Sequence, residues 1–262
     1  MTPLSISPAG VDLWIVFTSD VDDDLLGEYG LLLSLEERSR ARRFHFDRDR
    51  RAHVIARGLV RTALCRYAPL SPEEWRFETN RYGRPALSPD QFAAAPLTFN
   101  LSHTDGMIVL AVRRELAVGV DVENVWRHRV SCEIADRFFS AAEAATLRMA
   151  SPDELQVRFF EYWTLKESYV KARGAGLSIP LDQFSFTFPS GAHIGLEMDG
   201  ALGDTPARWR LWQFRPSAEH LVSVCAERAW DRLNVRRVIP LRTEEPFECA
   251  AVRDSCLIEA GV

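Results

Sequence analysis

Residues 159–176, FFEYWTLKESYVKARGAG, decide how the second half of this chain folds. The stretch contains no proline, and its glycines, Gly174 and Gly176, stand at its end, where a C-terminal helix cap requires them. The spacing of its side chains predicts a helix with two different faces. One face carries Phe160, Trp163, Glu167 and Lys171, and the other, which we expect in the core, carries Tyr162, Leu165 and Tyr169.

Lys166 and Lys171 of this stretch are the only lysines among the 32 Lys and Arg residues of the chain. In a chain so biased toward arginine, the two retained lysines indicate that this stretch needs an ammonium rather than a guanidinium. The simpler alternative for Glu167 and Lys171 is an ordinary i,i+4 surface pair, worth about 0.2–0.5 kcal/mol. We expect Lys171 to tolerate arginine poorly. Lys166 lies about a quarter turn from Glu167 and should tolerate it better, unless it pairs with an acid that fixes the helix.

Strand and helix patterns alternate outward from this helix. Residues 11–17 predict a strand, and residues 34–67 a mostly helical run that begins with a capping box at Ser34 and Glu37. Residues 96–125 predict three short strands. A second helical run, residues 131–176, is broken at 151–152, and alternating segments up to about residue 227 predict further antiparallel strands.

This order predicts an α+β fold, a pseudo-dimer of two similar lobes in which each lobe is an antiparallel sheet packed with a long helix. A faint echo between HVIARG (53–58) and SYVKARG (168–174) agrees with two related halves. We place the N-terminal lobe at residues 1–118 and the C-terminal lobe at residues 119–262, with a loose tail from about residue 231.

Composition limits the class of protein. The net charge of −5 argues against a general nucleic-acid binder. The five cysteines are scattered and form no CxxC pair, which indicates neither a disulfide framework nor a zinc site. The apolar run at 11–17 is too short for a signal peptide or a membrane span. We therefore expect a soluble, cytoplasmic protein that does not bind membranes, and we expect a monomer.

The segment AVGVDVE, residues 117–123, places two carboxylates on one face of a strand. Strand alternation puts Gly119, Asp121 and Glu123 on the same face, with the two acids about 7 Å apart. A wet strand end would look the same, and that alternative stays open for this segment alone. Together with Glu167, these acids supply the hard oxygen ligands that Mg²⁺ prefers, and Mg²⁺ commonly takes substrate phosphates as further ligands.

Positive charge for a polyanion is available nearby in the sequence. Residues 36–61 hold nine arginines against four acids, which fits either a solvated helical face or a phosphate clamp. Ser102 and His103, in FNLSHTDG, stand at a junction of strand and turn where they could contact phosphate. The chain has no GxxxxGK[ST] and no GxGxxG motif, which excludes the common P-loop and dinucleotide sites.

Five motifs in this order, YGRP, FNLSHTDG, GVDVE, RFFSAAE and WTLKESYVKARGAGLSIPL, resemble the Sfp-type 4′-phosphopantetheinyl transferases. The likeness spans roughly residues 10–230. It implies a pseudo-dimeric α+β fold with coenzyme A bound in the cleft between the halves. It also implies the reaction: 4′-phosphopantetheine moves from coenzyme A to a serine of an apo acyl or peptidyl carrier protein, and 3′,5′-ADP is released.

The resemblance also implies roles for individual residues. Asp121, Glu123 and Glu167 would hold Mg²⁺, or Mn²⁺ in its place. Coenzyme A would be bound by Arg38, Arg40, His53, Arg84, Ser102, His103 and Lys171. The catalytic set would comprise Glu167, Lys171, His103 and Glu143. For the base that takes the serine proton we predict Glu167, acting through a water of the metal shell, with Glu143 as the second candidate.

Two other functions share these residues. A Mg²⁺-dependent nucleotidyl transferase or phosphodiesterase would use the same acids and arginines without a carrier protein. A carrier-binding module descended from a transferase would have no need of the acids or of Lys171.

Overall fold

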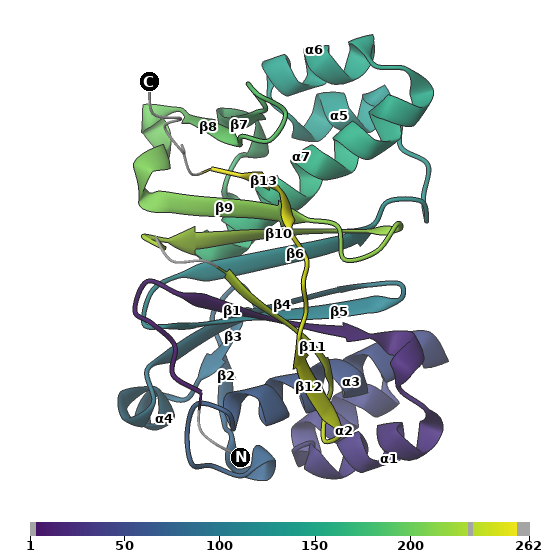
Figure 1. The fold of residues 1–262 in the computed structure, drawn as a ribbon, viewed down its shortest axis with the longest axis vertical. Helices are drawn as coiled ribbons and strands as arrows, with labels where there is room; N and C mark the ends of the chain where they lie inside the picture. The colour runs from purple at the N-terminus through teal and green to yellow at the C-terminus, as the bar shows by residue number, and fades with distance from the viewer. Residues whose placement is uncertain (1–3, 230–232, 256–262) are drawn as a thin grey trace. The chain divides into compact units, whose positions relative to one another are not determined.

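The computed structural model describes residues 4–229 and 233–255. The chain divides into two compact units, each made of two pieces of sequence (Figure 1). Unit 1 comprises Met1–Glu115 and Asp231–Glu248, and unit 2 comprises Leu116–Trp230 and Cys249–Val262. Both contain sheets and helices, so the α+β class predicted from the sequence is confirmed.

Unit 1 is built on a five-stranded sheet in the order β12-β11-β1-β5-β4. Its strands are β1 (Val11–Phe17), β4 (Leu97–Thr104), β5 (Met107–Arg114), β11 (Leu233–Ile239) and β12 (Thr243–Pro246). Strand β11 pairs with β1 in parallel, whereas the other neighbours are antiparallel. The expected purely antiparallel sheet is therefore wrong for this unit. The expected loose tail is also wrong where β11 and β12 form, because β11 pairs with β1 and β12 pairs with β11.

Helices of unit 1 cover its sheet and bury an apolar core that includes Trp14, Leu59 and Leu110. They are α1 (Asp23–Leu32), α2 (Leu35–Arg42), α3 (Asp47–Leu64) and α4 (Pro89–Ala94), and β2 (Phe77–Thr79) pairs with β3 (Pro85–Leu87). The capping box at Ser34 and Glu37 is confirmed. The run predicted as one helix is two, because the extended backbone of Phe46 starts α3 anew.

Unit 2 is built on a four-stranded antiparallel sheet in the order β13-β9-β10-β6. Its strands are β6 (Val118–Asn124), β9 (Trp209–Phe214), β10 (His220–Glu227) and β13 (Ala251–Asp254), with a separate pair β7 (Phe184–Thr187) and β8 (Gly195–Met198). Its helices are α5 (Cys132–Phe138), α6 (Ala141–Met149) and α7 (Pro152–Arg173). Helix α7 packs on β6 and β10 and ends at Gly174, whose φ of 66° is left-handed, as the glycine predicted.

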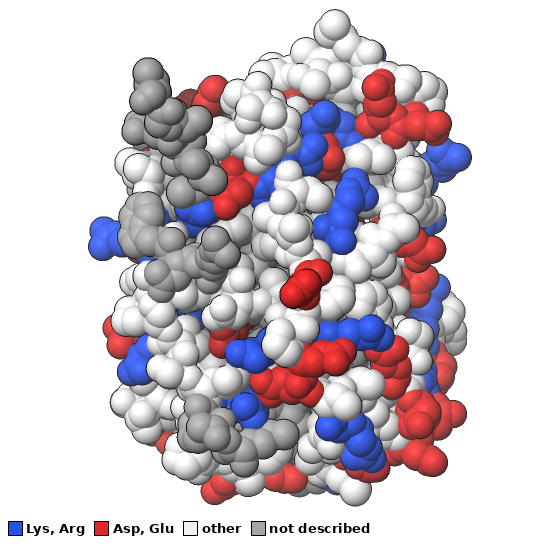
Figure 2. Space-filling view, viewed as in Figure 1, with Lys and Arg blue, Asp and Glu red and all other residues white. Residues whose placement is uncertain are grey.

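Short 3-10 helices connect these elements: η1 (Thr18–Asp20), η2 (Pro72–Glu74), η3 (Gly176–Ser178), η4 (Leu181–Gln183), η5 (Gly200–Leu202) and η6 (Pro206–Arg208). Within residues 4–229 and 233–255, no helix combines the length and the apolar character that a membrane crossing needs. Figure 2 shows Lys and Arg interspersed with Asp and Glu over the face in view. On that face the charges form no extended single-sign field of the kind that favours nucleic-acid binding.

Candidate active site

Gly119 brings strand β6 against the backbone of helix α7. A Cβ at this position would overlap the Ser168 carbonyl oxygen and the Ala172 amide nitrogen, so only glycine fits. The group that Gly119 admits is the backbone of the helix itself. The acids of β6 therefore lie close to the face of α7 that carries Glu167 and Lys171.

Asp121 and Lys171 are the first pair that this approach brings together. The Lys171 Nζ donates to Asp121 Oδ1 at 2.5 Å. The Asp121 side chain is 6% exposed and that of Lys171 is 27% exposed, so solvent reaches the ammonium but scarcely reaches the carboxylate. The ammonium of Lys171 therefore pairs with the strand acid Asp121, and its charge also acts on Glu167.

Glu123 and Glu167 extend this group into a cluster of three carboxylates. Burial raises the pKa of Glu123 to about 7, and the charges of Asp121 and Glu167 add to the rise, while Lys171 and a hydrogen bond from the Trp163 indole oppose it. Burial also raises the pKa of Glu167, again with a contribution from Asp121. The sequence placed Trp163 on the same helical face as Glu167 but assigned it no role. Among its aromatic neighbours, nothing indicated that the indole N–H would donate a hydrogen bond to Glu123.

The chemistry of this donor set suits a hard dication. Neighbouring carboxylates contribute to the raised pKa values of Glu123 and Glu167, a nearby double positive charge would offset that effect, and carboxylate oxygens are the ligands that Mg²⁺ selects. In the part of the chain that the structure describes, no three His, Cys, Asp or Glu side chains are already gathered as ligands around one point. In this structure the positive charge beside Asp121 is the ammonium of Lys171.

Glu143 does not share the surroundings of these acids. Its carboxylate, 1% exposed, pairs at 2.9 Å with Lys166 and accepts hydrogen bonds from the backbone N–H groups of Ser140 and Phe186. Both oxygens are thus engaged inside the protein. This environment favours a structural role over the base or metal role that the sequence suggested.

Lys166 meets the exception stated for it, since it does pair with an acid. Its side chain is fully buried and its Nζ also donates to the carbonyl oxygens of Leu181 and Phe184, at 2.7 and 2.6 Å. Burial lowers the pKa of Lys166, and the Glu143 charge opposes that shift. The expectation that this lysine tolerates arginine better than Lys171 no longer follows.

In unit 1, the structure gathers Arg40, His53 and Arg57 around the N-terminal part of α3. Burial lowers the pKa of His53, and the positive charges of Arg57 and Arg40 lower it further, against a hydrogen bond to the Glu37 carbonyl. Arg40 is exposed. Arg57 is already paired with Glu37, which leaves Arg40 and His53 as the better placed of the predicted anion-binding residues.

Glu37 is the centre of an ion-pair network that the sequence did not reveal. Its carboxylate pairs with Arg57 and, at 2.8 Å, with Arg61. Burial disfavours the charge, but Arg57, the Ser34 amide and Arg61 hold the pKa of Glu37 below its ordinary value. Several of the nine arginines of this segment are therefore structural, including Arg51, which pairs with Asp23.

The remaining predicted residues lie elsewhere in unit 1. Arg38 donates to the carbonyl oxygens of Leu33 and Leu31, at 2.9 and 2.7 Å, and so holds the start of α2. Arg84 reaches the Phe99 carbonyl of β4 at 3.5 Å. Ser102 is buried and His103 is exposed at the end of the same strand.

Comparison with known proteins identifies the family. The family model of the 4′-phosphopantetheinyl transferase superfamily matches residues 117–225, and that of the 4′-phosphopantetheinyl transferase N-terminal region matches residues 25–115. A 4′-phosphopantetheinyl transferase of Bacillus subtilis is 33% identical over 74% of this chain and 82% of its own length.

Two further proteins are similar to this chain. The 4′-phosphopantetheinyl transferase HetI of a Nostoc species is 35% identical over 64% of this chain and 70% of its own. The crystal structure of Thermotoga maritima holo-[acyl-carrier-protein] synthase covers 44% of this chain and 64% of that chain, at 18% identity and a TM-score of 0.35, too little to argue from. With a third of its residues shared over most of the Bacillus enzyme, and with both family models matched in order, this chain belongs to the 4′-phosphopantetheinyl transferase superfamily.

Proposed function

We propose that this transferase takes 4′-phosphopantetheine from coenzyme A in a Mg²⁺-dependent reaction and attaches it to a serine of an apo acyl or peptidyl carrier protein. The other product is 3′,5′-ADP. The observation that carries the proposal is the cluster of Asp121, Glu123 and Glu167 with the Lys171 ammonium on the facing elements β6 and α7.

The chemistry asks mainly for positioning and for positive charge. The carrier serine attacks the β-phosphate of the coenzyme A pyrophosphate, and negative charge grows on the phosphate oxygens. Mg²⁺, when held by Asp121, Glu123 and Glu167, supplies electrostatic stabilisation of that charge. Lys171 stabilises the same charge with an ammonium on a flexible stem, which its partly exposed position allows.

A carboxylate must also take the proton of the serine. We assign this step to Glu167, because its side chain lies on the same face of α7 as Lys171. Glu143 is set aside as the alternative, since Lys166 and two backbone amides already occupy its oxygens.

Residues of unit 1 would bind the phosphates of coenzyme A. Arg40 and His53, which lie near each other, suit the 3′-phosphate. Arg84, Ser102 and His103 suit the pyrophosphate. Arg38 contributes through the fold of α2, because its guanidinium is engaged by two carbonyl groups.

The cellular setting belongs to the same proposal. The four cysteines that lie within the described residues are all free thiols, as expected in a reducing compartment. We therefore place the enzyme in the cytoplasm, as a monomer acting on carriers of fatty-acid, polyketide or nonribosomal-peptide synthesis.

The test is the mass of an apo carrier after incubation with coenzyme A, Mg²⁺ and enzyme. Wild-type enzyme should add one phosphopantetheine, and Asp121→Asn should lose at least 100-fold in rate, about 2.7 kcal/mol in barrier. The matched control is Asp153→Asn, an exposed aspartate in the first turn of α7, which should keep its rate. An Asp121→Asn enzyme as fast as wild type would refute the site. Release of 3′,5′-ADP without carrier would indicate a phosphodiesterase instead.

A further inference from the structure

The last turn of α7, which carries Lys171, is bound to a buried aspartate between η5 and η6. The side chain of this residue, Asp204, is 1% exposed. Its Oδ2 accepts hydrogen bonds from the Tyr169 hydroxyl at 3.0 Å and from the Arg173 guanidinium at 2.8 Å. The same guanidinium donates to the Tyr169 hydroxyl at 2.7 Å. Tyr169 and Arg173 stand two residues before and two residues after Lys171, and the proposed reaction gives neither of them a role.

The carboxylate of Asp204 also ties this turn to the start of β9. The Trp209 indole N–H donates to Oδ2 at 2.9 Å, and the Thr205 amide donates to Oδ1 at 2.9 Å. Burial alone would raise the pKa of Asp204, but these two bonds, the Tyr169 hydroxyl and the charge of Arg173 hold it below its ordinary value. Asp204 is therefore an anion, and hydrogen bonds to an ionised acceptor are roughly twice as strong as neutral ones.

The position of Lys171 near the end of α7 makes such support important. The last carbonyl groups of a helix have no partner within it, and helix ends fray for that reason. A step of two residues turns a helix by about 200°, so Tyr169 and Arg173 stand on the side of α7 away from Lys171. The turn is thus held on one side by Asp204 and on the other by the bond from Lys171 to Asp121.

We propose that Asp204 is a positioning residue of the transferase: through Tyr169 and Arg173 it fixes the last turn of α7 and so sets where the Lys171 ammonium stands beside Asp121. It acts on the reacting phosphates only through Lys171. The inference therefore rests on the function proposed for Lys171 in the transfer. A misplacement of about 1 Å can cost roughly 100-fold in rate, so a weakened anchor should be measurable.

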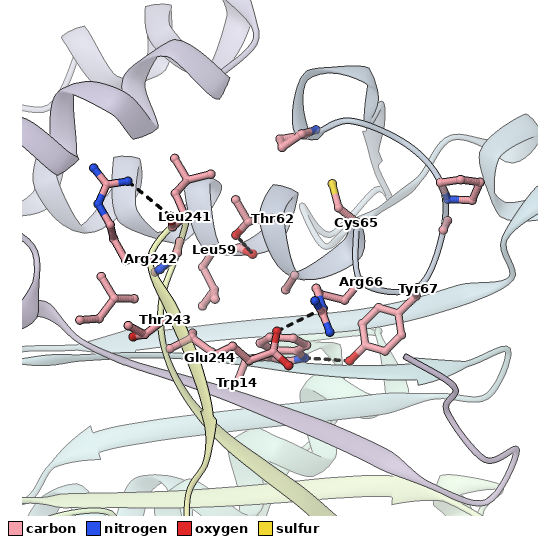
Figure 3. A pocket seen from close by; sticks show the side chains of 17 residues that line it. Trp14, Leu59, Thr62, Cys65, Arg66, Tyr67, Leu241, Arg242, Thr243 and Glu244 are labelled. Atoms are coloured by element: carbon pink, nitrogen blue, oxygen red, sulfur yellow. Dashed lines mark hydrogen bonds and ion pairs between the residues drawn. The ribbon is translucent and has the colours of Figure 1, made fainter. Parts of the chain in front are cut away.

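Two tyrosines with matching hydrogen bonds provide the variant and its control. Tyr169→Phe keeps the ring and removes the hydroxyl that donates to Asp204, a milder change than removal of the carboxylate that several donors share. Tyr67→Phe is the matched change in unit 1. The Tyr67 hydroxyl likewise donates to a buried aspartate, Asp12, at 2.7 Å and accepts from a second donor, the Trp14 indole, at 2.9 Å (Figure 3).

Rates of carrier modification should separate these two variants. At saturating coenzyme A and carrier, Tyr169→Phe should lower kcat about tenfold, whereas Tyr67→Phe should stay within about twofold of wild type. Similar losses in both variants would mean that general stability sets the rate, and would overturn the proposal. A wild-type rate for Tyr169→Phe would overturn it as well.

A double-variant cycle tests whether the effect passes through Lys171. Lys171→Met removes the ammonium that Asp204 is proposed to place. In that background Tyr169→Phe should therefore change the single-turnover rate by no more than about twofold. If Tyr169→Phe lowers the rate as much without Lys171 as with it, Asp204 acts by another route and the proposal is wrong.

A spectroscopic measurement that needs no activity completes the test. Lys166 and Lys171 are the two lysines of the chain, so isotope-labelled lysine gives two Cε signals in an NMR correlation spectrum, and Lys171→Met assigns them. Tyr169→Phe should shift or broaden the Lys171 signal, and Tyr67→Phe should leave it unchanged. An unmoved Lys171 signal in Tyr169→Phe, with an inactive Lys171→Met, overturns this inference alone. A wild-type rate for Lys171→Met overturns the proposed function of Lys171 and this inference with it.

Discussion

Replacing Lys166 by methionine removes the ammonium from the most enclosed ion pair of unit 2 and keeps nearly the same side-chain volume. In the native protein, Lys166 directs its Nζ to Glu143, Leu181 and Phe184, and its side chain has no exposed surface. The Nζ also lies 4.2 Å from the centroid of the Phe184 ring. In Lys166→Met, Glu143 keeps its charge in a site that is 1% exposed, with nothing to balance it.

The expected loss follows from that burial. Breaking a buried ion pair by removing one partner costs about 3–5 kcal/mol. That is a large part of a total unfolding free energy of about 5–15 kcal/mol. Lys166→Arg keeps the charge but forces a larger group into a closed space, at about 1–3 kcal/mol. Lys171→Met also leaves a buried carboxylate, Asp121, without its cation, but solvent reaches the position of the Lys171 ammonium, so the loss should be smaller than that of Lys166→Met.

Urea unfolding followed by circular dichroism, together with the carrier mass assay, separates the two lysines. Lys166→Met should lower stability by about 3 kcal/mol or more, whereas Lys171→Met should lower it less and should lose activity. The double variant Lys166→Met, Glu143→Leu should recover part of the loss, because an apolar pair leaves no buried charge. A Lys166→Met protein within about 1 kcal/mol of wild type would refute the reasoning, since an exposed pair costs no more than that.

Substituting Gly119 by alanine should push β6 away from α7. The value of kcat/KM should then fall at least tenfold, about 1.4 kcal/mol, and the unfolding midpoint should fall as well. Unchanged kinetics would mean that the close approach of β6 to α7 is not needed. Lys171→Arg should cut kcat at least tenfold in single-turnover assays at saturating carrier, and a near-wild-type rate would show that any cation suffices. Burial raises the pKa of Glu123 to about 7, so the folded metal-free protein binds more protons than the unfolded chain between the two pKa values, and its stability falls as pH rises through that window. Mg²⁺ binds the ionised form and should therefore raise Tm more at pH 8 than at pH 6, a difference that Glu123→Gln should abolish; equal Mg²⁺ shifts at both pH values in the wild type would contradict this. Arg40→Ala should raise KM for coenzyme A more than for 3′-dephospho-coenzyme A, whereas Arg38→Ala should affect stability and spare that difference, and equal effects of Arg40→Ala on both substrates would remove it from the 3′-phosphate site.

Much of the candidate site was predictable because it depends on short-range geometry. Strand alternation put Asp121 and Glu123 on one face of a strand, and helical spacing put Glu167 and Lys171 on one face of a helix. The end of α7 at Gly174 followed from the conformational freedom of glycine. These patterns repeat within a few residues, so local sequence carries them.

What the sequence did not predict depends on partners far along the chain. Strand β11 pairs with β1 across more than 200 residues, and its sequence LNVRRVI carries two arginines that obscure its strand pattern. The burial of Lys166 depends on where α6 and η4 pack, so the helical period alone gave only its direction, about a quarter turn from Glu167. In the sequence, Glu37 similarly resembled only the third residue of a local helix cap. Its ion pair with Arg61 forms because α3 packs back against α2.

The parallel pairing of β1 with β11 has a consequence for synthesis of the chain. Strand β1 precedes β11 and β12 by more than 200 residues and therefore leaves the ribosome long before the sheet of unit 1 can be completed. Until then β1 has one unpaired edge, a template for pairing with another nascent chain. Proteolytic removal of the residues after 230 would recreate that edge in the finished protein. Strands β11 and β12 thus act as a cover for β1, and truncation before them would endanger solubility by exposing its edge.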